Sequence, residues 1–256
     1  MKVNLFMVGP AGSGKSSVTG AFYRWLKKNV DYEVKAVNLD PGAEYIPYTP
    51  DFDIRSLFTT REIMIKEKLG PNAAMIEASN RMVRERKLIV DKISSLNAEI
   101  TIIDTPGQME AFIFHESGPK LVSLIPNSIA IFILDASVIH RVNELTIGLL
   151  LSVITQLKLD VPTLSIINKS DTMPKKEQNK LIELIQDPFK IREAIENTAR
   201  KYSSGAIVDV LLSIADFLPS VLPALRPVLV SANTLEGFDM LLDLIHEIYC
   251  TCGDLT

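Results

Sequence analysis

Eight residues near the start of the chain, 9–16, read GPAGSGKS and have the types and spacing needed to hold phosphate. They match the pattern G-x-x-x-x-G-K-[ST], in which glycines let successive backbone N–H groups point at one anion. Lys15 would add a positive charge for the terminal phosphates, and the Ser16 hydroxyl is placed to bind Mg²⁺. A glycine-rich surface turn is the alternative, but an apolar run before the motif and a helical pattern after it favour a nucleoside-phosphate site. The residues expected to contact the nucleotide here are Gly12, Ser13, Gly14, Lys15, Ser16 and Ser17.

Two aspartates follow apolar runs that read as strands, and each can serve the same site. Asp104 begins the sequence DTPGQME, so a carboxylate able to reach Mg²⁺ is followed three residues later by Gly107, whose N–H can contact the terminal phosphate. Gln108 comes next and can hold the attacking water. Asp40 begins DPGAE and can serve Mg²⁺ or orient water, although Asp, Pro and Gly also favour a simple turn. The candidate catalytic residues are Lys15, Asp40, Asp104 and Gln108, and the candidate metal ligands are Ser16, Asp40 and Asp104.

A second strand-end motif, NKSD at 168–171, predicts selection of guanine. The Asp171 carboxylate can accept hydrogen bonds from N1–H and the exocyclic amine of guanine, and adenine has no matching donors. Asn168 can bond the purine edge, and the aliphatic stem of Lys169 can lie over the ring. In the sequence SAN at 231–233, the backbone N–H of Ala232 fits a contact to the guanine O6 atom. We therefore expect large selectivity for guanine nucleotides, on the order of 10⁴.

Six short apolar runs must form the frame that positions these residues. They are apolar throughout, which is typical of parallel strands covered by helices on both faces. We therefore predict a doubly wound α/β fold with a mostly parallel sheet, in which the candidate residues gather outside the carboxyl ends of the strands. The predicted strands are 3–8, 34–39, 100–104, 129–134, 163–167 and 228–230.

One domain over residues 1–256 is expected, with a helical insertion at 172–225. Three helical stretches, followed by a segment with regularly spaced prolines, indicate this insertion. Its amphipathic faces are most simply core, and a surface for a partner is the alternative. The apolar stretch 145–159 falls short of the roughly 20 apolar residues that span a bilayer. We therefore expect a buried helix there and no membrane contact.

The segment 59–96 is predicted to be helical, with a break at Gly70 and Pro71. Thr59 and Glu62 have the spacing of a capping box. Asn72 is then a suitable N-cap for a long helix over 73–96. Apolar residues recur along this helix at seven-residue spacing, and both packing on the chain's own sheet and contact with a second subunit account for the stripe.

Composition bears on the class and location of the protein. A formal net charge of -4 argues against a nucleic-acid binder that depends on a general basic surface, so no direct nucleic-acid contact is predicted. The only cysteines, Cys250 and Cys252, lack further ligands at metal-binding spacing. Reduced thiols in a cytoplasmic protein are therefore expected.

On these motifs the chain resembles the GPN-loop GTPases over nearly its full length, in an archaeal form. The quoted elements are GPAGSGKS at 9–16, NLDPGAE at 38–44, LGPNAA at 69–74, DTPGQME at 104–110, NKSD at 168–171 and SAN at 231–233. LGPNAA distinguishes the family. The resemblance implies a homodimer in which Gly70, Pro71 and Asn72 of one subunit reach the phosphates bound by the other. It makes Asn72 a further candidate catalytic residue, acting in trans, and links the family to assembly of RNA polymerase.

Motifs and resemblance together predict Mg²⁺-dependent hydrolysis of GTP to GDP and phosphate by a homodimeric switch. Turnover is expected to be slow, because no arginine is evident in the GPN segment. Two other functions use the same phosphate loop. One is a phosphotransferase with an acceptor pocket, and the other is an assembly factor for which hydrolysis is only a timer.

Overall fold

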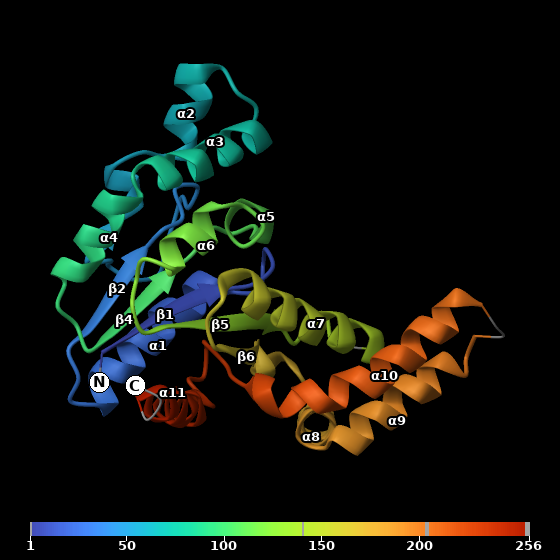
Figure 1. The fold of residues 1–256 in the computed structure, drawn as a ribbon. Helices are drawn as coiled ribbons and strands as arrows, with labels where there is room; N and C mark the ends of the chain where they lie inside the picture. The colour runs from blue at the N-terminus through green and yellow to red at the C-terminus, as the bar shows by residue number, and fades with distance from the viewer. Residues whose placement is uncertain (1, 140, 203–204, 254–256) are drawn as a thin grey trace.

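The computed structural model describes the chain except for residues 1, 140, 203–204 and 254–256, and it shows an α/β architecture with helices on both faces of one sheet (Figure 1). Within the described residues, seven parallel strands lie in the order β3-β2-β4-β1-β5-β6-β7. The predicted doubly wound fold is confirmed. The strands are β1 (Val3–Val8), β2 (Val34–Asn38), β3 (Phe52–Asp53), β4 (Ile100–Asp104), β5 (Ser128–Asp135), β6 (Thr163–Asn168) and β7 (Val228–Leu229).

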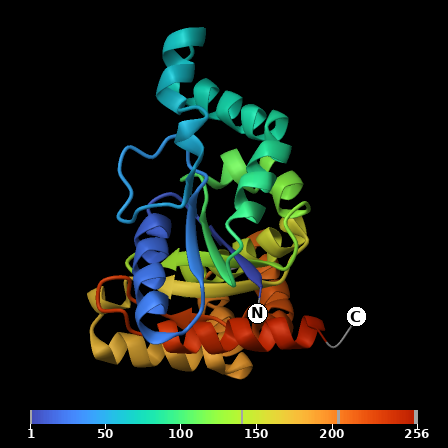
Figure 2. The same cartoon turned by 90° about the vertical axis from the view of Figure 1, so that its left-hand side faces the viewer.

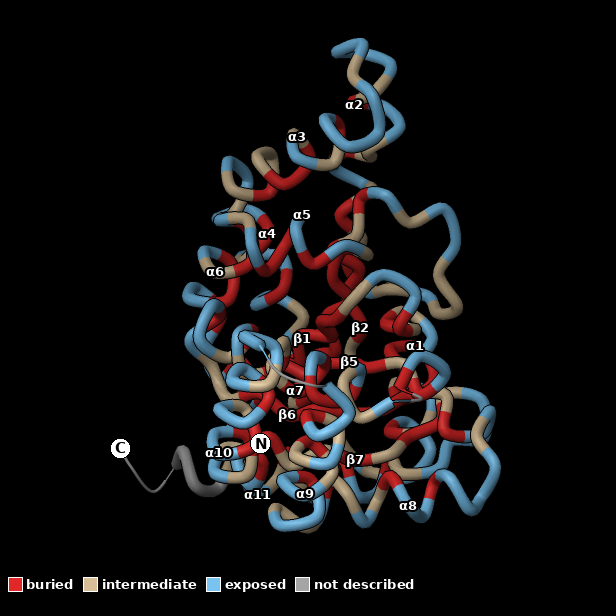
Figure 3. The backbone as a smooth tube through the Cα atoms, turned by 90° about the vertical axis from the view of Figure 1, so that its right-hand side faces the viewer, coloured by how far each residue is buried: buried red, intermediate tan, exposed pale blue. Residues whose placement is uncertain are grey.

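Two hydrophobic clusters, one on each face of the sheet, hold the layers together. On one face, α1 and α11 contribute Phe22 and Phe238, whose ring centroids lie 5.1 Å apart. The other face carries α3 to α7, with α8 to α10 continuing the same cluster (Figure 2). Every residue of β4 and β6 is buried, as the uniformly apolar runs predict for strands covered on both sides (Figure 3). The helices are α1 (Lys15–Asn29), α2 (Thr60–Glu67), α3 (Pro71–Arg84), α4 (Arg86–Ser95), α5 (Met109–Phe112), α6 (Ser117–Val122), α7 (Val142–Leu159), α8 (Lys175–Gln186), α9 (Pro188–Ala199), α10 (Ala206–Leu225) and α11 (Phe238–Gly253).

The helices of segment 59–96 differ from the expectation in two ways. The capping box is present, since Glu62 N donates to Thr59 Oγ1 over 3.1 Å and Thr59 N donates to a Glu62 carboxylate oxygen. Gly70, however, is the N-cap of α3, so Asn72 lies inside the first turn and is not the cap. Pro71 begins the helix because its fixed φ suits that position and its missing N–H has no partner there anyway. The long helix also breaks at Glu85, where α3 ends and α4 starts.

The chain between β6 and β7 forms α8, α9 and α10. The prolines do not end α10, which runs through Pro219 and Pro223 to Leu225. Each internal proline costs a helix roughly 3 kcal/mol. Burial of Leu218, Leu222 and Leu225 offsets this, since a buried leucine contributes about 1.5–3 kcal/mol.

Two of the described helices, α7 and α10, are long and apolar enough to cross a membrane by length and composition. The sequence predicts a buried helix at α7, and this holds for one face only. Leu145 and Leu149 are buried against the sheet, while Ile147 and Leu157 on the other face are exposed. The side chains of Cys250 and Cys252 lie outside the described residues.

Candidate nucleotide-binding and active site

The phosphate loop connects β1 to α1 and lies directly against two neighbouring parts of the site. Gly9 has φ +146°, and a Cβ there would lie 2.4 Å from the carbonyl oxygen of Ile133 in β5. Gly14 has φ +91°, and its Cβ would lie 2.5 Å from Nδ2 of Asn168. Only glycine meets both requirements, a positive φ and no side chain. The two glycines therefore let the loop pack on β5 and on the guanine-recognition motif.

Lys15 is buried within this loop and turned onto backbone oxygens. Its Nζ donates to the carbonyls of Gly9, Pro10 and Gly107 over 2.8–2.9 Å. Burial lowers the pKa of Lys15 to about 8, and the charges of Asp104 and Asp40 only partly oppose this. The amine is thus held beside the phosphate loop and beside the segment that carries Gln108.

The lowered pKa of Lys15 predicts how nucleotide affinity depends on pH. A bound phosphate favours the ammonium form and raises the pKa above its value of about 8 in the free protein. Affinity for GDP should therefore be retained below that pH and fall above it, by up to about tenfold per pH unit, until the pKa of the complex is reached. Titration with a fluorescent GDP analogue at increasing pH measures the effect. Lys15→Met should bind weakly and show only the titration of the nucleotide itself, and a wild-type curve parallel to it would contradict the prediction.

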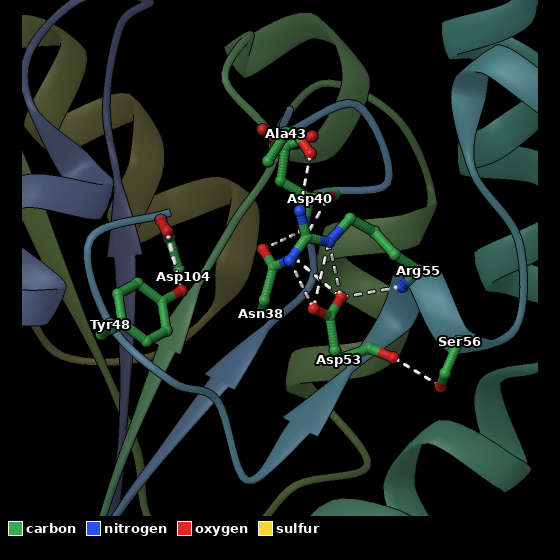
Figure 4. Close-up of polar contacts among 8 residues, drawn as sticks. All are labelled: Asn38, Asp40, Ala43, Tyr48, Asp53, Arg55, Ser56 and Asp104. Atoms are coloured by element: carbon green, nitrogen blue, oxygen red, sulfur yellow. Dashed lines mark hydrogen bonds and ion pairs between the residues drawn. The ribbon is translucent and has the colours of Figure 1, made fainter. Parts of the chain in front are cut away.

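Asp104 at the end of β4 offers one free oxygen in a buried position. Tyr48 donates its hydroxyl proton to Asp104 Oδ2 over 3.0 Å (Figure 4). Among the described residues, nothing makes a hydrogen bond of normal geometry to the buried Oδ1. Burial raises the pKa of Asp104 to about 6, and interactions with Ser16 and Tyr48 oppose the rise. An orphaned carboxylate oxygen beside Ser16 fits the hard oxygen ligands that Mg²⁺ prefers.

Asp40 follows β2 and is held by backbone amides. Its Oδ1 accepts from Gly42 N over 2.8 Å and its Oδ2 from Gly107 N over 3.1 Å. Burial raises the pKa of Asp40, and these two amides and Lys15 work against the rise. The structure thus brings Asp40, Asp104, Lys15 and Gly107 together, as the sequence predicts. It also shows that the Gly107 N–H, which is expected to contact phosphate, is engaged by Asp40 in this conformation.

Three residues to which the sequence analysis assigns no role, Asn38, Asp53 and Arg55, fix the turn after Asp40 (Figure 4). Asn38 Oδ1 accepts from Asp40 N over 3.0 Å, and Asn38 Nδ2 donates to Asp53 Oδ1. Arg55 forms a forked ion pair with Asp53 and donates to the carbonyl of Ala43 over 2.9 Å. Such a planar fork restrains both partners. The turn is therefore tied to β3 and to the 3₁₀ turn Ile54–Ser56 that follows it.

The guanine-recognition motif is assembled around the phosphate loop. Asn168 Nδ2 donates to Ser13 O over 3.1 Å, and Asn168 Oδ1 accepts from Ala232 N over 3.2 Å. Lys169 Nζ donates to Gly12 O over 3.0 Å and forms an ion pair with Asp135 at the end of β5. Asn168 thus links the phosphate loop to the 231–233 segment, and the Ala232 N–H, which is expected to contact guanine O6, is engaged by Asn168 in this conformation.

Two residues of the 231–233 segment hold the Asp171 carboxylate in place. Ser231 donates its hydroxyl proton to Asp171 Oδ1 over 2.6 Å, and Asn233 Nδ2 donates to Oδ2 over 3.3 Å. These contacts, that of Ser231 above all, lower the pKa of Asp171, so the carboxylate is ionised at neutral pH. Each carboxylate oxygen keeps a further lone pair for a donor on a base.

A cavity of about 370 Å³ lies where these segments meet. Its lining combines the phosphate loop and α1, the guanine-recognition motif and the 231–233 segment with one residue from the loop after Asp40. The lining residues are Gly14, Ser17, Arg24, Pro47, Asn168, Lys169, Asp171, Thr172, Ala232 and Asn233. Two of the predicted phosphate-loop residues, Gly14 and Ser17, therefore border the same cavity as the predicted guanine residues.

Two predicted catalytic residues, Gln108 and Asn72, are exposed to solvent. Gln108 is exposed at the start of α5, one residue beyond Gly107. Asn72 is exposed in the first turn of α3, and this end of α3 lies well away from the phosphate loop (Figure 1). Within the single described chain, Asn72 is not part of the cavity or of the contacts around Lys15.

Several site residues escape prediction from the sequence. Asp135 could have been found, because it directly follows the predicted strand 129–134 and so lies at the edge where ligands bind. Tyr48 and Pro47 lie in a segment without helix or strand, and Arg24 is one exposed residue of α1. No local pattern marks these three, because their contacts join segments far apart in the chain.

The comparisons with known proteins agree on one family. Residues 7–251 match a family described as a conserved hypothetical ATP binding protein. A GPN-loop GTPase of Pyrococcus abyssi is 36% identical over 252 residues, which are 97% of this chain and 98% of the relative. GPN-loop GTPase 3 of Kluyveromyces lactis is 27% identical over 85% of this chain and 84% of the relative.

A solved structure supports the same grouping. The crystal structure of a GTPase in apo form from Pyrococcus abyssi has a TM-score of 0.88 to this chain, at 33% identity, and each chain covers 98% of the other. The family description names ATP, whereas the curated relatives are named GTPases. The Asp171 carboxylate, positioned to accept two donors from a base, favours the second name.

Proposed function

This chain belongs to the GPN-loop GTPase family and is a GTP hydrolase, and from that premise we propose that it works with Mg²⁺ as a homodimeric switch. We further propose that the switch serves the assembly of a protein complex such as RNA polymerase, for which family membership is the support. In the homodimer, Gly70, Pro71 and Asn72 of each subunit reach the nucleotide of the other.

One observation carries the metal-dependent part of the proposal. The buried Oδ1 of Asp104 accepts no hydrogen bond of normal geometry from the described residues, and the carboxylate lies at the edge of the sheet beside Ser16 and Lys15. A buried polar atom without a partner costs about 1–3 kcal/mol, so a ligand that supplies one is favoured. Ser16 and Asp104 would hold the ion, and Asp40 would contact it through water. When bound, Mg²⁺ supplies charge neutralisation for the phosphates.

The chain's own residues account for the remaining parts of the reaction. The phosphate loop and Lys15 bind the phosphates, and Asn168, Lys169 and Asp171 bind and orient guanine. We assign Gln108 to the attacking water, since it follows Gly107 and its side chain is exposed at the site edge. Contact of γ-phosphate with the Gly107 N–H requires that amide to leave Asp40 Oδ2.

Phosphate release from purified protein tests this function directly. GTP with Mg²⁺ should give free phosphate and GDP, excess EDTA should stop the reaction, and ATP should be a poorer substrate by about 10⁴. Equal use of ATP would contradict guanine selection, and hydrolysis undiminished by EDTA would contradict the metal requirement. With γ-labelled GTP, label on a second molecule in place of free phosphate would indicate a phosphotransferase.

A further inference from the structure

Residues 43–50, here called the strap, lie in the connection between β2 and β3 and form no helix or strand (Figure 2). Side chains from three separate elements hold it at three points. Arg55 donates to the carbonyl of Ala43, and Arg24 of α1 donates to the carbonyl of Pro47, each over 2.9 Å. Tyr48 donates to Asp104 Oδ2 over 3.0 Å. The strap therefore spans the nucleotide site, with Pro47 at the guanine cavity and Tyr48 on the carboxylate that ends β4.

The strap packs on α1 at a helix position that has no side chain. A Cβ added to Gly20 would lie 3.0 Å from the carbonyl oxygen of Pro47 and 3.3 Å from Cδ1 of Tyr48. Glycine in a helix interior costs about 1 kcal/mol relative to alanine, so helix formation does not explain this residue. The absence of a side chain at Gly20 lets Pro47 and Tyr48 approach closely enough for the Tyr48 hydroxyl to reach Asp104.

Because Tyr48 reaches only one of the two carboxylate oxygens of Asp104, those oxygens differ in their contacts. Tyr48 occupies Oδ2, and Oδ1 is buried with no hydrogen bond of normal geometry from the described residues (Figure 4). A carboxylate pinned through one oxygen presents the other in a fixed direction. Hydrogen bonds of this kind, from a neighbour to a ligating group, typically change metal affinity by about 10- to 100-fold.

We propose that Tyr48 is a positioning residue that holds the Asp104 carboxylate with its free oxygen available to a divalent cation, and that Arg24 and Gly20 keep the strap where Tyr48 can do so. This inference rests on the proposed Mg²⁺ dependence of the site. It assigns to the strap a role that connects the guanine cavity with the metal-binding end, because Arg24 and Pro47 line that cavity while Tyr48 contacts Asp104.

The test measures how much Mg²⁺ is needed to slow the release of a fluorescent GDP analogue. Tyr48→Phe keeps the ring and removes the hydroxyl, so it should require about 10- to 100-fold more Mg²⁺ while GDP affinity in EDTA stays close to wild type. Gly20→Ala alters no polar group of the site, but its methyl pushes the strap away, and it should shift the requirement in the same direction. Tyr45→Phe, in the same strap at an exposed position, is the matched control.

The outcomes separate this inference from the proposed function. If wild-type protein releases the analogue equally fast with and without Mg²⁺, the metal requirement is wrong and the role of Tyr48 falls with it. If wild type responds to Mg²⁺ and both variants respond at the same concentration, only the positioning role is wrong. An equal loss of GDP affinity in EDTA and in Mg²⁺ would show a general structural role for the hydroxyl, which also overturns the inference.

Discussion

Replacing Asp171 by asparagine should weaken GTP binding by about 10²- to 10⁴-fold and turn the preference toward xanthosine triphosphate. A hydrogen bond to a charged group contributes about 1.5–3 kcal/mol, and the carboxylate is positioned to accept two from guanine. The asparagine amide can still accept one hydrogen bond, but its NH₂ group faces the exocyclic amine of guanine. Xanthine has an oxygen at that position and can accept from the NH₂ group. The Ser231 hydroxyl can still donate to the oxygen that remains at the Oδ1 position, whereas Asn233 Nδ2 loses its acceptor when NH₂ replaces Oδ2.

Competition against a fluorescent GDP analogue measures the affinities of GTP, xanthosine triphosphate and ATP. Asp243→Asn removes the same charge from an exposed position on α11 and should leave all three unchanged. If Asp171→Asn lowers the affinity for all three nucleotides to the same degree, the carboxylate supports the fold of the cavity and does not read the base. An unchanged affinity for GTP would place guanine elsewhere.

Replacing Asn72 by alanine should slow hydrolysis of bound GTP by about 10²- to 10³-fold with little change in GTP affinity. Loss of one polar group aimed at developing charge typically costs this much in rate. Asn72 is exposed in α3 and absent from the described contacts of its own phosphate loop, so a catalytic contact has to come from a second copy of the chain. Single-turnover measurement separates the chemical step from binding.

Mixing two inactive variants distinguishes a contact in trans from one in cis. Lys15→Met binds nucleotide poorly but retains Asn72, and Asn72→Ala binds nucleotide but lacks the side chain. In a mixed dimer, the nucleotide on the Asn72→Ala subunit meets the intact Asn72 of its partner. An equal mixture that exchanges freely should recover about a quarter of wild-type activity, since half of the dimers are mixed and each has one complete site. No recovery after confirmed subunit exchange would remove the role in trans.

Arg55 lies near the active site, and its contacts are consistent with the slow GTP turnover that we expect. Its charge acts on Asp40, but its guanidinium is committed to Asp53 and to the Ala43 carbonyl. An arginine that stabilises the transition state contributes about 10³–10⁵ in rate, and in this conformation Arg55 is not free to do so. The contacts of Arg55 instead indicate that it stabilises the turn after Asp40.

The fold and the centre of the site could be predicted because their signals are local. Each long strand is a mainly apolar run, and the motifs around Lys15, Asp104 and Asp171 follow strands directly. Other features depend on the tertiary structure. The two-residue strand β3 is too short to show a period, and the prolines of α10 are tolerated because leucines on the same helix are buried. The bond from Tyr48 to Asp104 joins residues 56 positions apart, which no window of sequence reveals.

The site is built from residues at the ends of several strands, and this affects how the chain unfolds. Lys15, Asp104, Asp135 and Asn168 follow or end four different strands, which are neighbours in the sheet order β4-β1-β5-β6. No part of the sheet can open locally at these strands without separating these residues of the nucleotide site, so a bound nucleotide opposes cooperative unfolding of the central sheet and not only of one loop. A ligand present at about one hundred times its dissociation constant adds about 2.7 kcal/mol to the unfolding free energy. Loss of nucleotide would therefore lower the thermodynamic stability of the whole subunit at the same time as it ends a catalytic cycle.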